Sequence, residues 1–267
     1  MGRRSYPKDL QKYWDSIAEA RLRYKYEDTQ NICFEYSKIV IREFLKDFIQ
    51  LEGKKIFKSD LWEEAIDLER SFCKGALENC KPSLLAGIDI SPFIVKRAIR
   101  NLSPLEGQVE FEIGDMKNIP YQSNSFDFIY SSGSIEHILD PQEALKEYYR
   151  ILKPKGIAFV TVPSRFSYYR ILQEVVVRLV KGLDYGRWEK KFTRKELQKM
   201  LEAEGFKLIK IKKILLNPPY VHHLYRFRPF AKILPRFYQA LLKFEDTWIN
   251  EWLGKDLAVI ATKKEAS

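Results

Sequence analysis

A strand runs directly into a helix within the sequence Leu84-Leu85-Ala86-Gly87-Ile88-Asp89-Ile90-Ser91-Pro92. Its first residues have the short length and apolar character of a buried strand. Ser91 is a good N-cap for the following helix, and Pro92 suits the first helical position. Asp89 therefore stands at the carboxyl end of a strand, directly before a helix.

Similar short apolar runs predict strands on both sides of this stretch. They are Lys55 to Phe57, Val109 to Ile113, Phe126 to Tyr130 and Ile157 to Val162. Helix-like segments lie between most of them, and alternating strands and helices predict a mainly parallel sheet covered by helices on both faces. Ligands of such sheets bind beyond the carboxyl ends of the strands, so candidate functional residues are sought there.

Residues 8 to 24 and 30 to 50 have the apolar spacing of helices. We therefore expect an N-terminal helical extension over residues 1–50. One α/β domain is expected over residues 51–267, with insertions at about 163–191 and 215–254, because a chain of 267 residues suits one large domain with attachments.

The positive charge is concentrated in one part of the chain. The net charge is +10, and residues 163–254 alone contain 19 basic and 9 acidic side chains. A basic segment rich in aromatic residues suggests an anionic partner, such as a phospholipid surface, a phosphorylated substrate or RNA. The alternative is a solvated basic face that keeps the protein soluble.

Cysteine and histidine usage predicts neither a disulfide framework nor a metal site. Cys33, Cys73 and Cys80 are odd in number, and the adjacent His222 and His223 lack metal-pair spacing. The chain starts without an apolar leader and contains no run of 18 apolar residues. We expect a cytoplasmic protein.

Acidic residues end two of the predicted strands, 26 residues apart. A carboxylate at the position of Asp89 can accept hydrogen bonds from two ribose hydroxyls. Asp115, followed by Met116, suits a purine, because the carboxylate accepts from an exocyclic amine while the thioether packs on the ring. The alternatives are that Asp89 caps a helix and that Asp115 forms a turn.

Several motifs occur around these two acids. They are Gly87 to Pro92, Gly114-Asp115-Met116, Ile119-Pro120, Ser125-Phe126-Asp127, Glu136-His137-Ile138 and Ile151 to Gly156. In this order the chain resembles the class I S-adenosylmethionine-dependent methyltransferases, and within them the small-molecule branch that includes the quinone-biosynthesis methyltransferases. The resemblance is dense from about 84 to 162 and resumes from Phe192 to Phe206. It implies a three-layer, Rossmann-like, seven-stranded sheet, mostly parallel, that ends in an antiparallel hairpin.

The resemblance also implies a binding site for S-adenosylmethionine. Asp89 would bind the ribose hydroxyls with Ile90 on the adenine, and Asp115 would take the adenine amine with Met116 beside the ring. The methionine end and the substrate entrance would be lined by Ser131 and Ser132. His137 is the candidate general base, with a histidine that merely packs at a helix start as its alternative.

The chain departs from the family where a glycine-rich loop usually follows the first strand. Here the sequence reads Lys58-Ser59-Asp60-Leu61-Trp62-Glu63-Glu64-Ala65. One interpretation is that Ser59 and Asp60 form a different tight turn, whose carboxylate meets the ammonium group of the cofactor; the other is that cofactor binding is weakened or lost. Asp60 is also a candidate N-cap, with Glu63 completing a capping box.

The function expected is transfer of a methyl group to a small-molecule acceptor, with a hydrophobic acceptor as one option. The alternatives are a non-catalytic or regulatory protein with this fold and an RNA methyltransferase, although no RNA-binding module accompanies the core. The apolar, basic-edged segments Arg165 to Lys181 and Asn217 to Phe230 would form a lid over the acceptor, contact an anionic membrane surface, or pack as ordinary cap helices.

Overall fold

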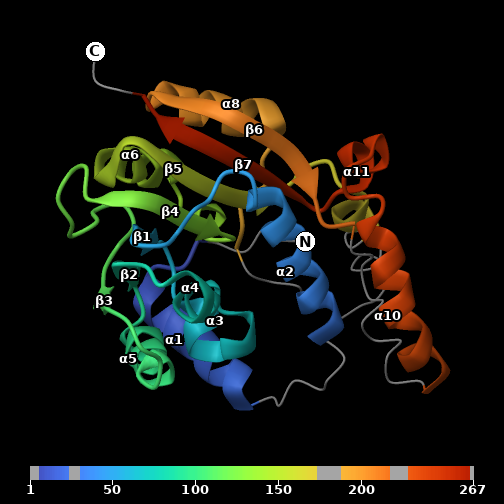
Figure 1. Cartoon of the computed structure of the whole chain (residues 1–267), viewed down its shortest axis with the longest axis horizontal. Coiled ribbons are helices and arrows are strands. Elements are labelled where there is room, and N and C mark those ends of the chain that lie inside the picture. Colours follow the sequence, from blue (N-terminus) through green and yellow to red (C-terminus); the bar gives the residue numbers. More distant parts are fainter. Residues whose placement is uncertain (1–5, 24–30, 173–187, 217–227, 265–267) are drawn as a thin grey trace.

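The computed structural model describes residues 6–23, 31–172, 188–216 and 228–264. A single sheet forms the centre of the molecule (Figure 1). Its strands are β1 (Lys55–Lys58), β2 (Leu84–Asp89), β3 (Val109–Ile113), β4 (Phe126–Ser132), β5 (Leu152–Pro163), β6 (Phe206–Ile214) and β7 (Asp256–Lys263). Their order is β3-β2-β1-β4-β5-β7-β6, in seven strands. Strands β1 to β5 pair in parallel, and β7 runs antiparallel to β5 and β6. The predicted fold class is confirmed.

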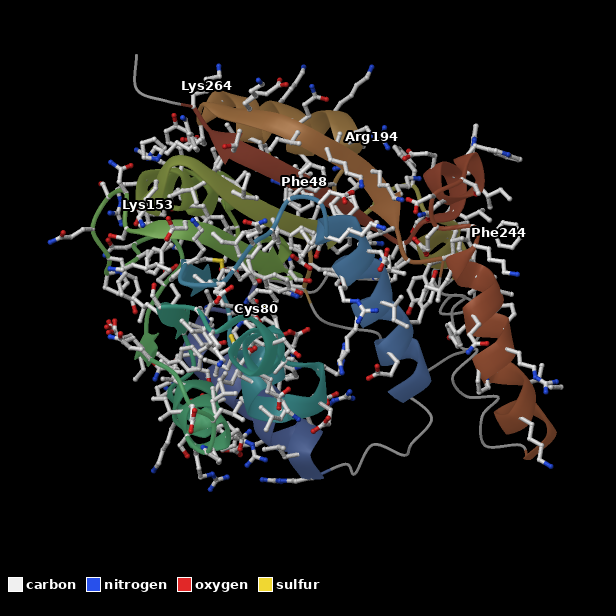
Figure 2. All side chains as sticks on the ribbon, viewed as in Figure 1. Phe48, Cys80, Lys153, Arg194, Phe244 and Lys264 are labelled. Carbon is white, nitrogen blue, oxygen red and sulfur yellow. The ribbon has the colours of Figure 1, made fainter. Side chains whose placement is uncertain are left out.

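Helices cover the sheet on both faces. One face carries α1 (Leu10–Arg23), α2 (Asn31–Leu45), α3 (Trp62–Ile66), α4 (Phe72–Cys80), α5 (Pro92–Leu102) and α10 (Arg228–Leu242). The other carries α6 (Pro141–Ile151) and α8 (Arg194–Ala203). Successive strand residues point to opposite faces, so Ile56 joins the first core and Phe57 the second. Figure 2 shows side chains filling both layers, with Phe244 and Lys264 exposed at the periphery.

Local signals fix where the helices next to the cavity begin. The Ser91 hydroxyl accepts a hydrogen bond from the backbone N–H of Ile94 at 3.1 Å, as expected of an N-cap. Asp140 caps α6 in the same way, and proline follows each cap. The cap at Ser91 ends β2 and opens α5 at one point, so Asp89 is held at the edge of the sheet.

The two N-terminal helices pack on different parts of the α/β unit. Helix α1 lies against α5 and α3, where Asp15 contacts the Ser91 hydroxyl. Helix α2 lies against α10, with the rings of Tyr36 and Tyr238 5.3 Å apart. The division into residues 1–50 and 51–267 stays a prediction. None of the helices in the described ranges combines the length and hydropathy needed to span a bilayer.

Candidate active site

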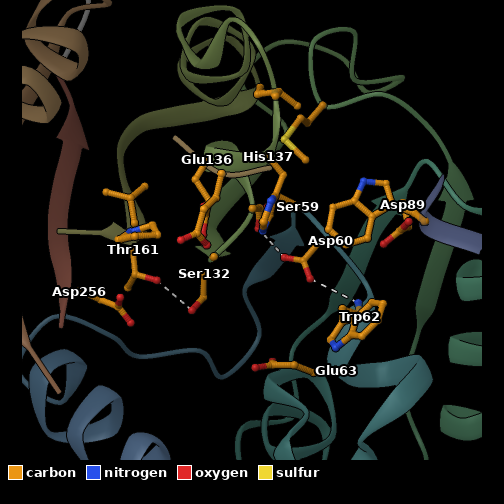
Figure 3. A pocket seen from close by; sticks show the side chains of 18 of the residues that line it. Ser59, Asp60, Trp62, Glu63, Asp89, Ser132, Glu136, His137, Thr161 and Asp256 are labelled. Carbon is orange, nitrogen blue, oxygen red and sulfur yellow. Dashed lines mark hydrogen bonds between the residues drawn. The ribbon is translucent and has the colours of Figure 1, made fainter. Parts of the chain in front are cut away.

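A cavity of about 610 Å³ opens at the carboxyl ends of the parallel strands. It is bordered by residues at or beyond the ends of β1, β2, β3, β4 and β5, among them Asp60, Asp89 and Ser132 (Figure 3). Trp14 of α1 also lines it. This is the edge at which ligands bind in open α/β sheets. Helix α1 therefore contributes to the cavity, although the sequence pattern only predicted a helix there.

Eight of the nine residues selected from the sequence line this cavity. They are Ser59, Asp60, Asp89, Ile90, Asp115, Met116, Ser132 and His137. The ninth, Ser131, is fully buried, and its hydroxyl lies 3.2 Å from the Tyr148 hydroxyl. Neighbouring residues of a strand point to opposite faces, so Ser131 and Ser132 do not share the cavity.

Asp89 is buried at the end of β2, with 8% of its surface exposed. Its carboxylate oxygens accept hydrogen bonds from the backbone N–H groups of Ser91 at 2.9 Å and Leu61 at 3.1 Å. Burial raises the pKa of Asp89 to about 7, although these two hydrogen bonds oppose the shift. The carboxyl group is therefore fixed in place and still has acceptor capacity toward the cavity.

Asp115 follows β3 and is more open to solvent. Its carboxylate accepts from the backbone N–H of Lys117 at 2.9 Å and lies 3.4 Å from the Lys117 ammonium group. The turn expected as an alternative is therefore present, and the side chain still lines the cavity. Met116 packs against the second core, where its sulfur lies 3.8 Å from the Tyr148 hydroxyl.

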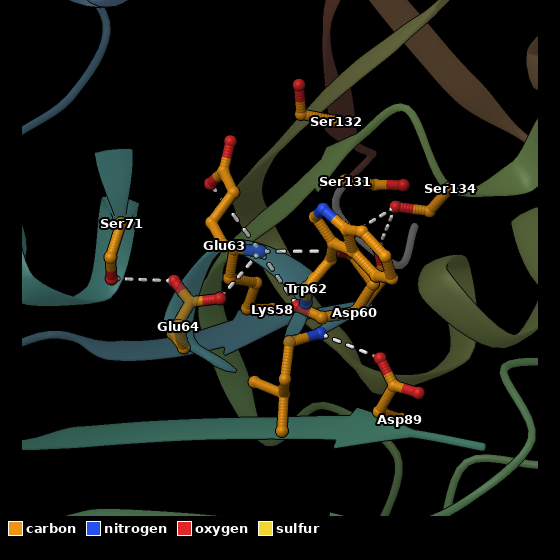
Figure 4. Close-up of polar contacts among 12 residues, drawn as sticks. Lys58, Asp60, Trp62, Glu63, Glu64, Ser71, Asp89, Ser131, Ser132 and Ser134 are labelled. Atoms are coloured by element: carbon orange, nitrogen blue, oxygen red, sulfur yellow. Dashed lines mark hydrogen bonds and ion pairs between the residues drawn. The ribbon is translucent and has the colours of Figure 1, made fainter. Parts of the chain in front are cut away.

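The loop after β1 is arranged around a buried lysine (Figure 4). Lys58 is 1% exposed, and its ammonium group donates to the backbone carbonyl of Asp60 at 2.8 Å. The same nitrogen lies 3.1 Å from Glu64 and 3.8 Å from Glu63. Burial alone would lower the pKa of Lys58, but the nearby carboxylates outweigh it and hold that pKa well above the usual value.

Asp60 is not the helix cap that its spacing suggested. The N-cap of α3 is Leu61 and has no side-chain cap bond, so the predicted capping box with Glu63 is wrong. Asp60 instead accepts from the Ser134 hydroxyl at 2.5 Å and from the backbone N–H of Trp62 at 3.3 Å. Glu63 turns toward Lys58, and burial raises the pKa of Glu63 to about 7.

The far part of the cavity is bordered by the ends of β4 and β5 and the short helix η3 (Ile135–His137). The hydroxyls of Ser132 and Thr161 lie 3.0 Å apart. His137 directs Nδ1 to the backbone carbonyl of Trp188 at 2.9 Å, and its ring packs edge-on against Trp14, with centroids 5.0 Å apart. His137 therefore packs at the helix start, as the alternative interpretation expected, and also lines the cavity.

Three residues that shape the site were not among the candidates predicted from the sequence. Lys58 and Glu64 are nearly fully buried charges, and Glu136 is 4% exposed and faces the cavity. Lys58 is a charged residue at the last position of a strand, and this was the sequence signal that could have identified it. Within the described residues, no group of three or more His, Cys, Asp and Glu side chains is arranged to hold a metal ion.

Comparison with known proteins agrees with this geometry. The family described as a methyltransferase domain matches residues 69–160, so the match starts beyond β1 and the loop after it. The 2-methyl-6-phytyl-1,4-hydroquinone methyltransferase 2 of Oryza sativa subsp. japonica is 30% identical over 142 residues, which are 52% of this chain and 37% of that protein. Phosphoethanolamine N-methyltransferase 3 of Arabidopsis thaliana is 36% identical over 77 residues, covering 29% of this chain and 16% of that protein.

The aligned regions thus span roughly a third or less of the length of these two relatives. A solved structure of a SAM-dependent methyltransferase from Thermotoga maritima shares the fold, with a TM-score of 0.60 and 17% identity over 96% of this chain and all of that one. Residues 69–160 therefore match a methyltransferase domain, and the chain as a whole shares the fold of a solved SAM-dependent methyltransferase.

Proposed function

We propose that this protein transfers a methyl group from S-adenosylmethionine to a small molecule bound in the same cavity. The observation that carries the proposal is that Asp89 and Asp115, from the ends of neighbouring strands, line one cavity of about 610 Å³. A cavity of this size suits a small-molecule site. The activities of the similar proteins, which act on hydroquinones and phosphoethanolamine by their names, support a small-molecule acceptor.

The residues of the cavity fit the chemistry of this cofactor. Asp89 would accept from the ribose hydroxyls with Ile90 on the adenine, and Asp115 would accept from the adenine amine with Met116 beside the ring. The methionine end would meet Ser59 and Asp60 on one side and Ser132 on the other. Ser131 takes no part in this proposal, because its hydroxyl is bonded to Tyr148.

Methyl transfer asks mainly for alignment and exclusion of water. S-adenosylmethionine supplies a methyl group that is already activated by its positive sulfur. The chain would hold the acceptor in line behind that methyl group and shield both from solvent, a task for which Trp14 of α1 is well placed. His137 lines the acceptor end and remains a candidate base.

Calorimetric titration with S-adenosylhomocysteine tests the proposal. We expect saturable binding by the native protein and binding weaker by about 1 to 3 kcal/mol in Asp89→Ala, because buried hydroxyl groups lose their acceptor. Asp47→Ala, an exposed carboxylate outside the cavity, is the matched control. Equal affinity in all three proteins would remove Asp89 from the site. Binding without methyl transfer to any acceptor would favour the non-catalytic alternative.

We also propose a cytoplasmic location with peripheral contact to an anionic membrane surface. Cys73 and Cys80 are free thiols, as expected of a reducing compartment. The surface outside the cavity carries Trp248 and Trp252 of α11 (Trp248–Leu253), which are 74% and 73% exposed. Exposed tryptophan near lysine and arginine is typical of a membrane interface, and Lys243 precedes this helix by five residues.

Much of the apolar, basic sequence assigned to this contact, residues 173–187 and 217–227, lies outside the described residues. Co-sedimentation with vesicles tests the part that is described. We expect binding to phosphatidylserine vesicles, weaker binding to phosphatidylcholine vesicles, and loss of binding in Trp248→Ser with Trp252→Ser. Ile209→Ser, on the exposed surface of β6, is the control. Failure to bind either vesicle would end this proposal, and salt-sensitive RNA binding instead would favour the RNA alternative.

A further inference from the structure

Glu136 is a buried carboxyl group on the cavity wall to which the proposed cofactor site gives no role. It lies in η3, shortly after β4, and is 4% exposed. One of its carboxylate oxygens, Oε2, is shielded from solvent and has no hydrogen-bond partner among the described residues. A buried polar atom without a partner costs free energy, so the position suggests that a ligand completes it.

The backbone around Glu136 is firmly held. Its carbonyl accepts from the backbone N–H of Lys190 at 2.8 Å, and the N–H of His137 donates to the Ser134 carbonyl at 3.1 Å. These backbone hydrogen bonds fix the position of the Glu136 carboxyl group on the cavity wall. In Figure 3 the Glu136 side chain points toward Ser132 and Asp256, across the cavity from Asp89.

The other carboxylates near Glu136, at the part of the cavity bordered by the ends of β4 and β5, already have cationic partners. Glu189 lies 2.6 Å from the Arg170 guanidinium group, and Asp256 lies 3.5 Å from the Lys255 ammonium group. In the described part of the chain no ion pair to Glu136 occurs. The ammonium group of Lys58 forms an ion pair with Asp60 in the loop after β1, so it is not a partner of Glu136. Glu136 is therefore the carboxyl group of this end that lacks a counter-charge among the described residues.

The charge around Glu136 favours a positively charged ligand. Burial raises the pKa of Glu136 well above the usual value, and Glu189, Asp256 and Asp60 raise it further. A cation that entered this end would relieve that repulsion and would lower the pKa of Glu136 again. The lining of the cavity includes more carboxylates than cationic side chains, although the chain has a net charge of +10.

We infer that Glu136 is a catalytic residue that receives the proton of a primary or secondary amine, and that the methyl acceptor of this protein is such an amine. The inference rests on the proposed function and adds the class of acceptor to it. It assigns the proton to a different side chain from His137, whose Nδ1 is engaged with the Trp188 carbonyl and whose ring packs on Trp14.

Atoms, protons and electrons balance in this step. The protonated amine passes one proton to the Glu136 carboxylate, which leaves a neutral amine and a neutral carboxyl group. The nitrogen lone pair then forms a bond to the methyl carbon while the bond from that carbon to sulfur breaks, and sulfur keeps the electron pair. The product is a protonated, methylated amine and a thioether, and Glu136 keeps its proton until the next ammonium group binds.

Binding of an amine should release a proton. Burial raises the pKa of free Glu136, and a bound ammonium group lowers that pKa again, so amine binding shifts the carboxyl group toward its ionised form and releases protons to the buffer. The apparent heat of binding then depends on the ionisation enthalpy of the buffer. A group that only supports the fold of η3 would give no such dependence.

A calorimetric experiment on the full chain saturated with S-adenosylhomocysteine tests this inference. Phenethylamine and 2-phenylethanol, which differ in the charged nitrogen, are titrated in phosphate and in Tris. We expect the amine to bind at least about tenfold more tightly than the alcohol and to release a proton, because an ionic hydrogen bond replaces a neutral one. In Glu136→Gln both the preference and the proton release should vanish, with S-adenosylhomocysteine affinity unchanged.

Glu143→Gln, an exposed carboxylate on the adjoining helix α6, is the matched control and should behave as the native protein. An amine preference that is absent from the native protein, or that survives in Glu136→Gln, would overturn the inference. If Glu136→Gln does not fold, the buffer comparison on the native protein decides, since heats equal in both buffers would overturn the inference as well. Failure to bind S-adenosylhomocysteine would instead count against the proposed function itself.

Discussion

The loop after β1 and the loops after β2 and β3 border one cavity, but they are built from different chemistry. Beyond β2 and β3, a carboxylate at the strand end is fixed by a backbone N–H group two residues further on. Beyond β1, the backbone is held by Lys58, a buried cation whose partners include Glu64 and the Asp60 carbonyl. The contrast teaches that the edge of a cofactor site can be positioned either by local turns or by a buried ion network.

The two kinds of loop also touch each other. Leu61, in the β1 loop, donates its backbone N–H to Asp89 at 3.1 Å. Its side chain passes so close to β2 that a Cβ on Gly87 would lie 2.9 Å from it. The glycine that permits close approach is therefore in β2 and not in the β1 loop. Substitutions in each kind of loop test how far the two differ.

Substitution of Lys58 should cause the largest change, a loss of folding stability. Lys58→Met leaves the buried carboxylate of Glu64 without its counter-charge, and we expect the free energy of unfolding to fall by about 3 to 5 kcal/mol. Chemical denaturation measures this fall. The double variant Lys58→Met with Glu64→Gln should recover much of it, because the uncompensated charge is gone. A loss below about 1 kcal/mol in the single variant would show that the loop does not depend on the network.

Asp89 should make the folded state sensitive to pH. Its pKa is raised to about 7 in the folded protein, compared with 3.8 for an ordinary aspartate. Between these values the folded state binds more protons than the unfolded state, so this contribution to stability decreases as pH rises. Relative to Asp89→Asn, the native protein should lose about 4 kcal/mol from pH 4 to pH 8. A difference that stays constant, or increases, over this range would contradict the burial argument.

Substitution of Asp60 should have an intermediate effect, which is on the affinity for S-adenosylhomocysteine. Asp60→Ala removes the acceptor for the Ser134 hydroxyl and for the Trp62 N–H, and we expect about tenfold weaker binding of S-adenosylhomocysteine. Calorimetry measures it. Ser59→Ala removes a 3.1 Å contact with the Ser134 hydroxyl and should have a smaller effect. If neither substitution alters the affinity, the methionine end is held elsewhere.

Asp115 should have the smallest effect, because it is the most exposed of the three acids. We expect Asp115→Ala to weaken the binding of adenosine by about 0.5 to 1.5 kcal/mol through loss of one hydrogen bond. Inosine lacks the exocyclic amine and should bind native protein and variant equally. A matching loss for inosine would show that Asp115 supports the turn with Lys117 and does not contact the purine.

The loops after β2 and β3 could be predicted better than the loop after β1, because their contacts are local in the sequence. Helix caps at Ser91 and Asp140 and acids at strand ends depend on neighbours in the sequence, so the five parallel strands and the positions of Asp89 and Asp115 could be predicted from local patterns. The final antiparallel hairpin was expected only from the resemblance to the methyltransferases. The bond from Asp60 to Ser134 joins residues far apart in the chain, and the charges around Lys58 meet only because the loop folds back on them. No local pattern indicates such contacts, and the predicted cap at Asp60 failed there.

The far end of the cavity was predicted least well. His137 was identified, but its neighbour Glu136 was not, because an isolated glutamate usually lies on the surface. It is the packing of η3, with the Glu136 carbonyl bonded to Lys190, that buries it. Trp14 was likewise expected in a separate helix, and its approach to His137 depends on how α1 crosses the edge of the sheet.

A crystal structure of the protein with S-adenosylhomocysteine would show whether Asp89 and Asp115 hold one nucleoside. We predict both ribose hydroxyls within about 3.2 Å of the Asp89 carboxylate, the adenine amine at Asp115, and the amino acid end beside Asp60. A nucleoside bound outside this cavity, or bound within it without contact to Asp89 and Asp115, would contradict the proposed site.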